Sequence, residues 1–144
     1  MTSSSVRTVE RFFACLTARE WDELAPILSD GVLRIGPFGD QISGRESYLD
    51  FLRGTVPPHY RNDVARILGA PDNSSAFARV TEHLRYGDRE HHLEEVYSFD
   101  LDDDGLIRRV EIYWQTPQDD PGEFGSATSG DSYASSHRPE PGPD

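Results

Sequence analysis

The chain has 144 residues with 26 acidic and 14 basic side chains, which gives a net charge of −12 at pH 7. Such an acidic protein is a poor electrostatic match for nucleic acid phosphates or anionic lipids, so we expect neither as a partner. The basic residues are all arginine, which excludes Schiff-base chemistry on lysine, and the single cysteine, Cys15, excludes a disulfide framework and a thiolate metal site.

Two helices are expected at the start of the chain. Ser3–Ser5 offer hydroxyl groups that can cap a helix running to about Ala18. A second, short helix begins near Trp21, and Gly31 is a natural residue for its C-terminal end. Apolar residues at helical spacing predict the two buried faces, which are Val6, Val9, Phe12, Phe13 and Leu16, and then Trp21, Leu24, Ile27 and Leu28.

A short strand and a third helix come next. Val32–Ile35 has the apolar character of a strand, and the glycine-rich stretch 36–40 breaks it. Ser43 and Glu46 have the spacing of a capping box, so the third helix is expected to start there. Its apolar side is predicted to consist of Tyr48, Leu49, Phe51 and Leu52.

The next part of the chain is predicted to be a sheet. Asp102–Gly105 resembles part of a calcium loop but lacks the later glutamate at the required spacing, so we expect a hairpin turn. His91 and His92 are adjacent on a strand and point to opposite faces, so no metal site is expected. The strands are predicted at Tyr60–Leu68, Phe77–Tyr86, Glu90–Leu101 and Leu106–Gln115.

The chain divides into one folded domain, residues 1–116, and a tail, residues 117–144. The tail holds five of the ten prolines and almost no core-forming residues, so we expect it to be disordered. No apolar run approaches the length of a membrane span and no signal-peptide pattern opens the chain, so we expect a cytoplasmic protein.

The order of these elements predicts an α+β fold, in which a curved, mostly antiparallel sheet wraps on three N-terminal helices. Such a sheet encloses a cone-shaped cavity, and a cavity of this kind is a usual place for a ligand.

Short motifs in a fixed order carry a family resemblance. They are Phe12-Phe13, Trp21–Leu24, Leu28–Asp30, Gly44–Glu46, Asp104–Ile107 and Tyr113-Trp114. Over residues 6 to 116 the chain resembles the nuclear transport factor 2-like superfamily, and within it the SnoaL-like branch. The resemblance implies a cone-shaped α+β barrel that forms a homodimer through the outer face of its sheet. Its relatives include ketosteroid isomerases, polyketide cyclases, limonene epoxide hydrolases and non-catalytic binding modules.

The catalytic residues of these relatives are replaced at the matching positions. Similarity to ketosteroid isomerase puts its oxyanion-hole tyrosine at Phe12, its general base at Gly36 and its oxyanion-hole aspartic acid at Tyr97. Similarity to limonene epoxide hydrolase puts its arginine at His83 and its last aspartate at Ile112, where the cyclase aspartate also falls. The resemblance therefore implies the pocket without any of the three catalytic sets.

A different set of polar side chains is expected in the pocket. The resemblance puts Arg79 and His83 on the pocket side of one strand, and Glu95 and Tyr97 on the pocket side of the next. His83 would act as acid or base, with Glu95 as its partner or as the base itself. Tyr97 and Arg79 would stabilise an anion. The expected ligand-binding residues are Phe12, Arg34, Phe38, Asn62, Phe99, Ile112 and Trp114.

The register of the hairpin at residues 87–88 decides whether this set exists. A two-residue turn puts Glu82 on the same face of the sheet as Glu95. The apolar residues Val80 and Leu84, which alternate with Glu82 along the strand, then lie on that face too. A three-residue loop or bulge instead brings His83 opposite Leu93. Hydrophobicity favours the first register and the family resemblance favours the second, which we adopt.

The structural alternatives are an internal ion pair between Glu95 and Arg79 and a structural hydrogen bond at His83. The functional reading is a pocket for a hydrophobic small molecule, with isomerisation, cyclisation or hydrolysis by acid–base chemistry and no cofactor. The competing reading is a non-catalytic ligand-binding or dimerisation module, which the loss of every familiar catalytic set favours.

Overall fold

The computed structural model describes residues 3–86 and 88–115, so the predicted tail at 117–144 lies outside the described residues. These described residues form three α-helices, one 3₁₀ turn and six strands. In chain order these are α1 (Ser4–Ala18), α2 (Trp21–Leu24), the 3₁₀ turn (Ala25–Ile27), β1 (Leu28–Ile35), β2 (Gln41–Ser43), α3 (Arg45–Thr55), β3 (Arg61–Gly69), β4 (Ser75–Tyr86), β5 (Arg89–Leu101) and β6 (Ile107–Trp114).

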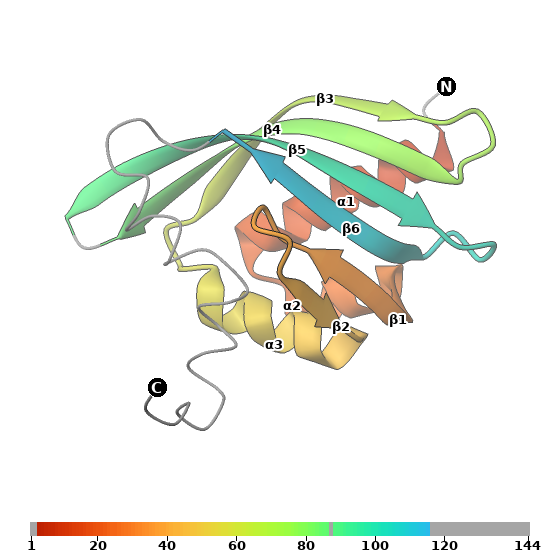
Figure 1. Ribbon diagram of the computed structural model, residues 1–144, viewed down its shortest axis with the longest axis horizontal. Helices are drawn as coiled ribbons and strands as arrows, with labels where there is room; N and C mark the ends of the chain where they lie inside the picture. The colour runs from red at the N-terminus through yellow and green to blue at the C-terminus, as the bar shows by residue number, and fades with distance from the viewer. Residues whose placement is uncertain (1–2, 87, 116–144) are drawn as a thin grey trace, which may run out of the picture.

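The six strands form one curved sheet in the order β2-β1-β6-β5-β4-β3 (Figure 1). Strands β1 and β6 run parallel, and all the other neighbours run antiparallel. The sheet is therefore mixed, and because β2 and β3 are its two free edges it does not close into a barrel. The predicted α+β class is confirmed. The sheet is mostly antiparallel, as predicted, and β1 and β6 form its one parallel pair within the described residues.

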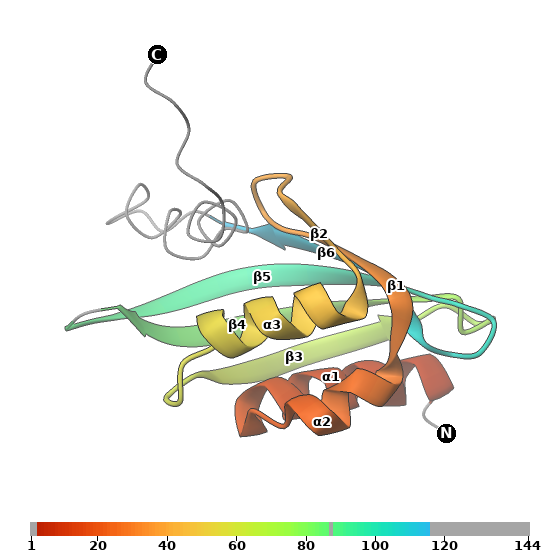
Figure 2. The same cartoon turned by 90° about the horizontal axis from the view of Figure 1, so that it is seen from below.

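The helices lie on one side of the sheet. Helix α1 packs on β3 and β4, and α3 packs on β1 and β2. Figure 2 shows α3 in front of the concave side of the sheet, with α1 and α2 below β3. No helix within the described ranges has both the length and the apolar composition needed to cross a membrane.

The first helix and the core follow the predicted periodicity. Ser3 caps α1, since its side chain accepts a hydrogen bond from the backbone N–H of Val6. Phe12 and Phe13 extend from α1 into the sheet, where their rings lie edge-on to Phe99 with centroids 5.1 and 5.9 Å away. Three aromatic rings therefore fix the helix on β5.

Two local predictions are wrong. The second helix ends at Leu24 and β1 already begins at Leu28, because the backbone there pairs with Ile107 of β6, far away in the sequence. Gly31 therefore lies inside a strand rather than at a helix end. Ser43 does not cap α3 either: it belongs to β2, and Gly44 precedes the helix without a side-chain cap.

Candidate functional site

The β4–β5 hairpin leaves only two residues between its paired strands. In this register Glu82 lies opposite Leu93, and Val80 lies opposite Glu95. The three-residue loop that the family resemblance favoured is therefore wrong, because the strand buries its small and apolar residues. The buried apolar side chains of β4 are Ala76, Ala78, Val80 and Leu84.

Arg79 and His83 consequently lie on the outer face of the sheet, away from the helices. Arg79 is exposed, and the His83 ring is held by Asp63 and His92, each at 2.6 Å from one of its nitrogens. The prediction that Arg79 and His83 share a pocket with Glu95 is wrong, because a shift of one residue turns every side chain of a strand to the opposite face.

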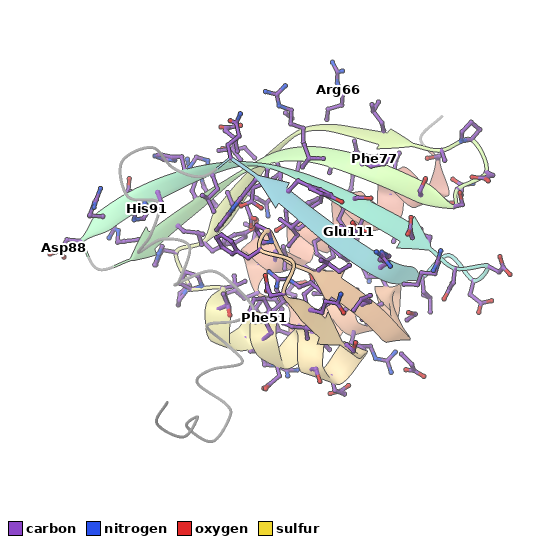
Figure 3. All side chains as sticks on the ribbon, viewed as in Figure 1. Phe51, Arg66, Phe77, Asp88, His91 and Glu111 are labelled. Atoms are coloured by element: carbon purple, nitrogen blue, oxygen red, sulfur yellow. The ribbon has the colours of Figure 1, made fainter. Side chains whose placement is uncertain are left out.

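A pocket with a cavity volume of about 70 Å³ lies between α3 and the concave face of the sheet, and it opens to solvent at its mouth. Phe51 of α3 lies at this junction of helix and sheet (Figure 3). The polar side chains of the wall are Arg34, Tyr48, Thr55, Tyr60, Glu82, Glu95 and Tyr97. The rest of the wall is apolar and consists of Leu16, Pro37, Phe51, Leu52, Val56, Leu84, Leu93, Ile112 and Trp114.

Two glutamates from neighbouring strands are buried in the wall of this pocket. Glu82 is 7% exposed and Glu95 is 4% exposed. The hydroxyl of Tyr97 donates to Oε1 of Glu82 at 2.6 Å, and the hydroxyl of Tyr60 donates to Oε2. The amide of Asn62 in turn donates to the Tyr60 oxygen at 3.2 Å. Both oxygens of Glu82 thus receive phenol hydrogens, which stabilise a negative charge there.

The surroundings of Glu95 favour its protonated form. Burial raises the pKa of Glu95 well above its ordinary value of 4.5, and the charge of Glu82 and a hydrogen bond with Glu82 raise it further. The charge of Arg34 opposes this shift of the pKa. Two carboxylates side by side in an apolar site cannot both ionise easily, so the pair keeps one proton at a pH where an exposed glutamate has lost it.

The tyrosines around the pair remain protonated donors. Burial raises the pKa of the Tyr60 and Tyr97 hydroxyls, and the negative charge of Glu82 raises both further. Burial also raises the pKa of Tyr48, on α3. The phenol hydrogens are therefore available at neutral pH to hold Glu82 or to reach a ligand.

A buried ion pair closes one side of the pocket. Nη1 of Arg34 lies 2.7 Å from Oδ2 of Asp40, and its guanidinium lies 4.6 Å from the ring centre of Phe51. Gly36 makes this approach possible, since a Cβ there would lie 2.6 Å from both the guanidinium and the Asp40 carboxylate. Arg34 therefore orders the β1–β2 turn while its charge is offset by Asp40.

Three of the predicted ligand-binding residues line the pocket: Arg34, Ile112 and Trp114. Phe12 and Phe99 do not line it, because both are fully buried in the core between α1 and β5.

The remaining two predicted ligand-binding residues lie beside the pocket. Asn62 lies behind the pocket wall. Its side-chain amide donates hydrogen bonds to the Tyr60 oxygen and to the backbone carbonyl of Phe13. Phe38 is half exposed in the β1–β2 turn, with its ring 5.4 Å from that of Trp114. Phe38 therefore belongs to the rim.

Glu82, Tyr60 and Tyr48 are the ionisable side chains of the described pocket wall that the predicted site lacks. The signal for Glu82 was present in the sequence, since it alternates with Val80 and Leu84, and burying those two requires burying Glu82. Helical spacing predicts that Tyr48 is buried on α3, but no local signal connects either Tyr48 or Tyr60, which precedes β3, with the pocket.

The expected hairpin turn at Asp102–Gly105 is confirmed, since the Asp102 carboxylate accepts from the backbone N–H groups of Asp104 and Leu106 at 2.9 and 3.0 Å. The Asp102 side chain therefore stabilises the turn. Within residues 3–86 and 88–115 no group of three His, Cys, Asp or Glu side chains has the arrangement of a metal site.

Known structures share this fold. A candidate ketosteroid isomerase from Kribbella flavida is 26% identical, with a TM-score of 0.68 over 98% of this chain and 91% of its own. An epoxide hydrolase of the limonene epoxide hydrolase type from Mycobacterium tuberculosis is 21% identical, with a TM-score of 0.70 over 79% and 84%. The protein RV0760c from the same organism, solved with estradiol-17β-hemisuccinate, is 17% identical, with a TM-score of 0.71 over 79% and 95%.

No curated protein sequence matches the chain. The sequence model of the SnoaL-like domain, however, matches residues 9–110, from the middle of α1 into β6. That range contains the acid pair and most of the pocket wall. By this match the chain belongs to the SnoaL-like domain family.

Proposed function

We propose that this protein binds a hydrophobic small molecule in its pocket and converts it by acid–base chemistry without a cofactor. The observation that carries the proposal is the burial of Glu82 and Glu95 together in the pocket wall, where burial and the neighbouring carboxylate raise the pKa of Glu95. A carboxyl group that holds a proton beside one that does not can donate and accept protons in one reaction. Isomerisation, cyclisation and hydrolysis each need that combination.

Each residue has a role in this proposal. Glu95 donates the proton to the substrate, and Glu82 is the base that accepts one. Tyr97 and Tyr60 orient Glu82 through their hydroxyls, and Trp114 supplies a flat apolar wall. The similarity to the estradiol-bound protein and to the two enzyme structures supports a hydrophobic substrate.

Turnover by matched variants tests the proposal. A panel of hydrophobic enones and epoxides is incubated with the protein, and products are measured by mass spectrometry. Glu95→Gln should reduce turnover by about 10²–10⁴-fold, as expected for loss of a general acid. Glu94→Gln is the control, because Glu94 lies next in sequence but points to the outer face, where it accepts from Thr81 at 3.0 Å. Equal turnover by the two variants would exclude Glu95 as the acid.

A non-catalytic binding module is the second candidate function. Glu82 already has a phenol donor on each oxygen, which is the satisfied arrangement that a purely structural polar cluster requires. On this alternative the wild-type protein binds hydrophobic probes and produces no product from any member of the panel.

We also propose that a second copy of the chain covers the outer face of the sheet. Leu68 lies opposite Phe77, and Val96 opposite Tyr113, and all four are exposed there. Figure 3 shows Phe77 on β4 beside this face. Sedimentation velocity should find a dimer that Phe77→Asp converts to a monomer. Phe38→Asp, at an aromatic residue equally exposed on the pocket rim, should leave the dimer intact.

A further inference from the structure

The charged groups of the pocket wall do not balance. The described wall contains one basic side chain, Arg34, and two carboxyl groups, those of Glu82 and Glu95. The charge of Arg34 is offset by Asp40 at 2.7 Å. Glu82 and Glu95 are both buried in this wall, 7% and 4% exposed, and each adds a negative charge when it ionises. A buried charge without a counter-ion is costly, so a cation at this point would be favoured.

Aromatic rings also line the pocket. Five of the residues that line the pocket have an aromatic ring, and the negative faces of such rings attract cations. They come from β5, β6, α3 and the segment before β3, and Tyr60 and Tyr97 reach Glu82 through their hydroxyls. They are Tyr48, Phe51, Tyr60, Tyr97 and Trp114.

We propose that the pocket selects a hydrophobic ligand with one basic nitrogen, whose ammonium group lies against Glu82 and Glu95. The inference uses the same pocket as the proposed function but requires only binding, not turnover. The N–H groups of the ammonium donate to the carboxylate oxygens, and the hydrocarbon part covers the apolar wall. A neutral ligand leaves the negative charge uncompensated, and an anionic ligand adds a second one.

Binding of such a cation changes the protonation of the pair. The groups that face Glu95 are Glu82 on β4, Tyr97 on β5, Arg34 on β1 and Tyr60 before β3. Of these, the charge of Glu82 is what an ammonium group would cancel. The ligand keeps its own proton, and Glu95 releases up to one proton to the solvent, so that both carboxylates face the cation.

A series of three probes with one hydrocarbon skeleton tests the inference on the wild-type protein. They are 4-phenylbutylamine, 4-phenylbutanol and 4-phenylbutyrate, and their dissociation constants are measured by titration calorimetry. We expect the amine to bind at least about tenfold more tightly than the alcohol, and the carboxylate to bind most weakly. Titration at about pH 6 in two buffers of different ionisation enthalpy should show proton release with the amine and none with the alcohol.

Glutamine variants test whether the ammonium group binds at the two glutamates. Glu82→Gln and Glu95→Gln should each reduce the preference for the amine to within about twofold of the alcohol, while Glu94→Gln keeps it. If a variant fails to fold, the probe series and the proton release measured on the wild type still test the inference. Equal binding of amine and alcohol overturns the inference, as does binding of none of the probes or a preference for the amine that survives in both variants.

The outcome separates this inference from the proposed function. Turnover of neutral enones or epoxides without any preference for the amine overturns the cation site and leaves the acid–base function. A clear preference for the amine, with no turnover of any substrate by the wild type, supports the cation site and overturns the acid–base function.

Discussion

Glu82 and Glu95 lie one diagonal step apart on neighbouring antiparallel strands, since Glu82 is opposite Leu93 and Glu95 is opposite Val80. Long side chains on such a diagonal can meet on one face of a sheet. The hydrogen bond and the repulsion between these two carboxyl groups therefore follow from the pairing of β4 with β5.

The protonation of Glu95 predicts how stability depends on pH. Because its pKa is raised in the folded state, Glu95 keeps its proton in the folded protein between about pH 4.5 and its folded-state pKa, where the unfolded chain has lost it. The free energy of unfolding should therefore fall as the pH rises from 4.5 through the folded-state pKa, by up to about 1.4 kcal/mol per pH unit. Urea unfolding at several pH values checks this, and Glu95→Gln should remove this part of the slope. If the variant has the same slope, the pH dependence of stability comes from groups other than Glu95.

Tyr97→Phe should destabilise the protein by about 1–3 kcal/mol, because it removes a donor from a buried carboxylate. The control is Ser74→Ala, which removes a hydroxyl that donates to the carboxylate of Asp72 at 2.6 Å in an exposed turn. That change should stay within about 0.5 kcal/mol. Urea unfolding at neutral pH measures both, and equal effects would mean that Tyr97 contributes little to holding Glu82.

Gly36→Ala should destabilise the protein by about 1–3 kcal/mol, because the added methyl group overlaps the Arg34–Asp40 ion pair. Gly54→Ala, in α3, is the matched control, since nothing lies within 4 Å of a Cβ at Gly54. Alanine is the better helix residue, so this variant should gain about 0.5–1 kcal/mol. Thermal unfolding distinguishes the two signs, and a stabilised Gly36→Ala would show that the ion pair moves aside easily.

His83→Ala should leave the pocket unchanged, because His83 lies on the outer face with Asp63 and His92. The dissociation constant of the tightest phenylbutyl probe should change less than about twofold. Leu84→Ala is the comparison, since Leu84 is the next residue and lines the pocket. A loss of affinity in His83→Ala as large as that in Leu84→Ala would contradict this placement.

Much of the fold could be predicted from periodicity, because α1, α3 and the long strands carry regular apolar patterns. The failures are at places where distant segments decide. Leu28 enters a strand rather than a helix because it pairs with β6, and no feature near Leu28 in the sequence announces that pairing.

Only part of the site could be predicted, because the face that β4 presents depends on its pairing with β5. Glu95 and Tyr97 were placed in the pocket correctly because they alternate with the buried residues of their own strand. The partner strand was assigned the wrong face, although Val80 and Leu84 already favoured the observed register. A family resemblance of low identity aligns strands well, but it does not determine which face each side chain occupies.

The two-residue connection between β4 and β5 has a consequence for comparing family members. This hairpin carries two alternative sets of chemical groups, acidic on the concave side and rich in arginine and histidine on the convex side. The number of residues at its tip selects which set meets a ligand. Relatives should therefore be grouped by whether that number is odd or even before their aligned residues are compared, because two proteins with the same letters at 79, 82 and 83 can present opposite chemistry.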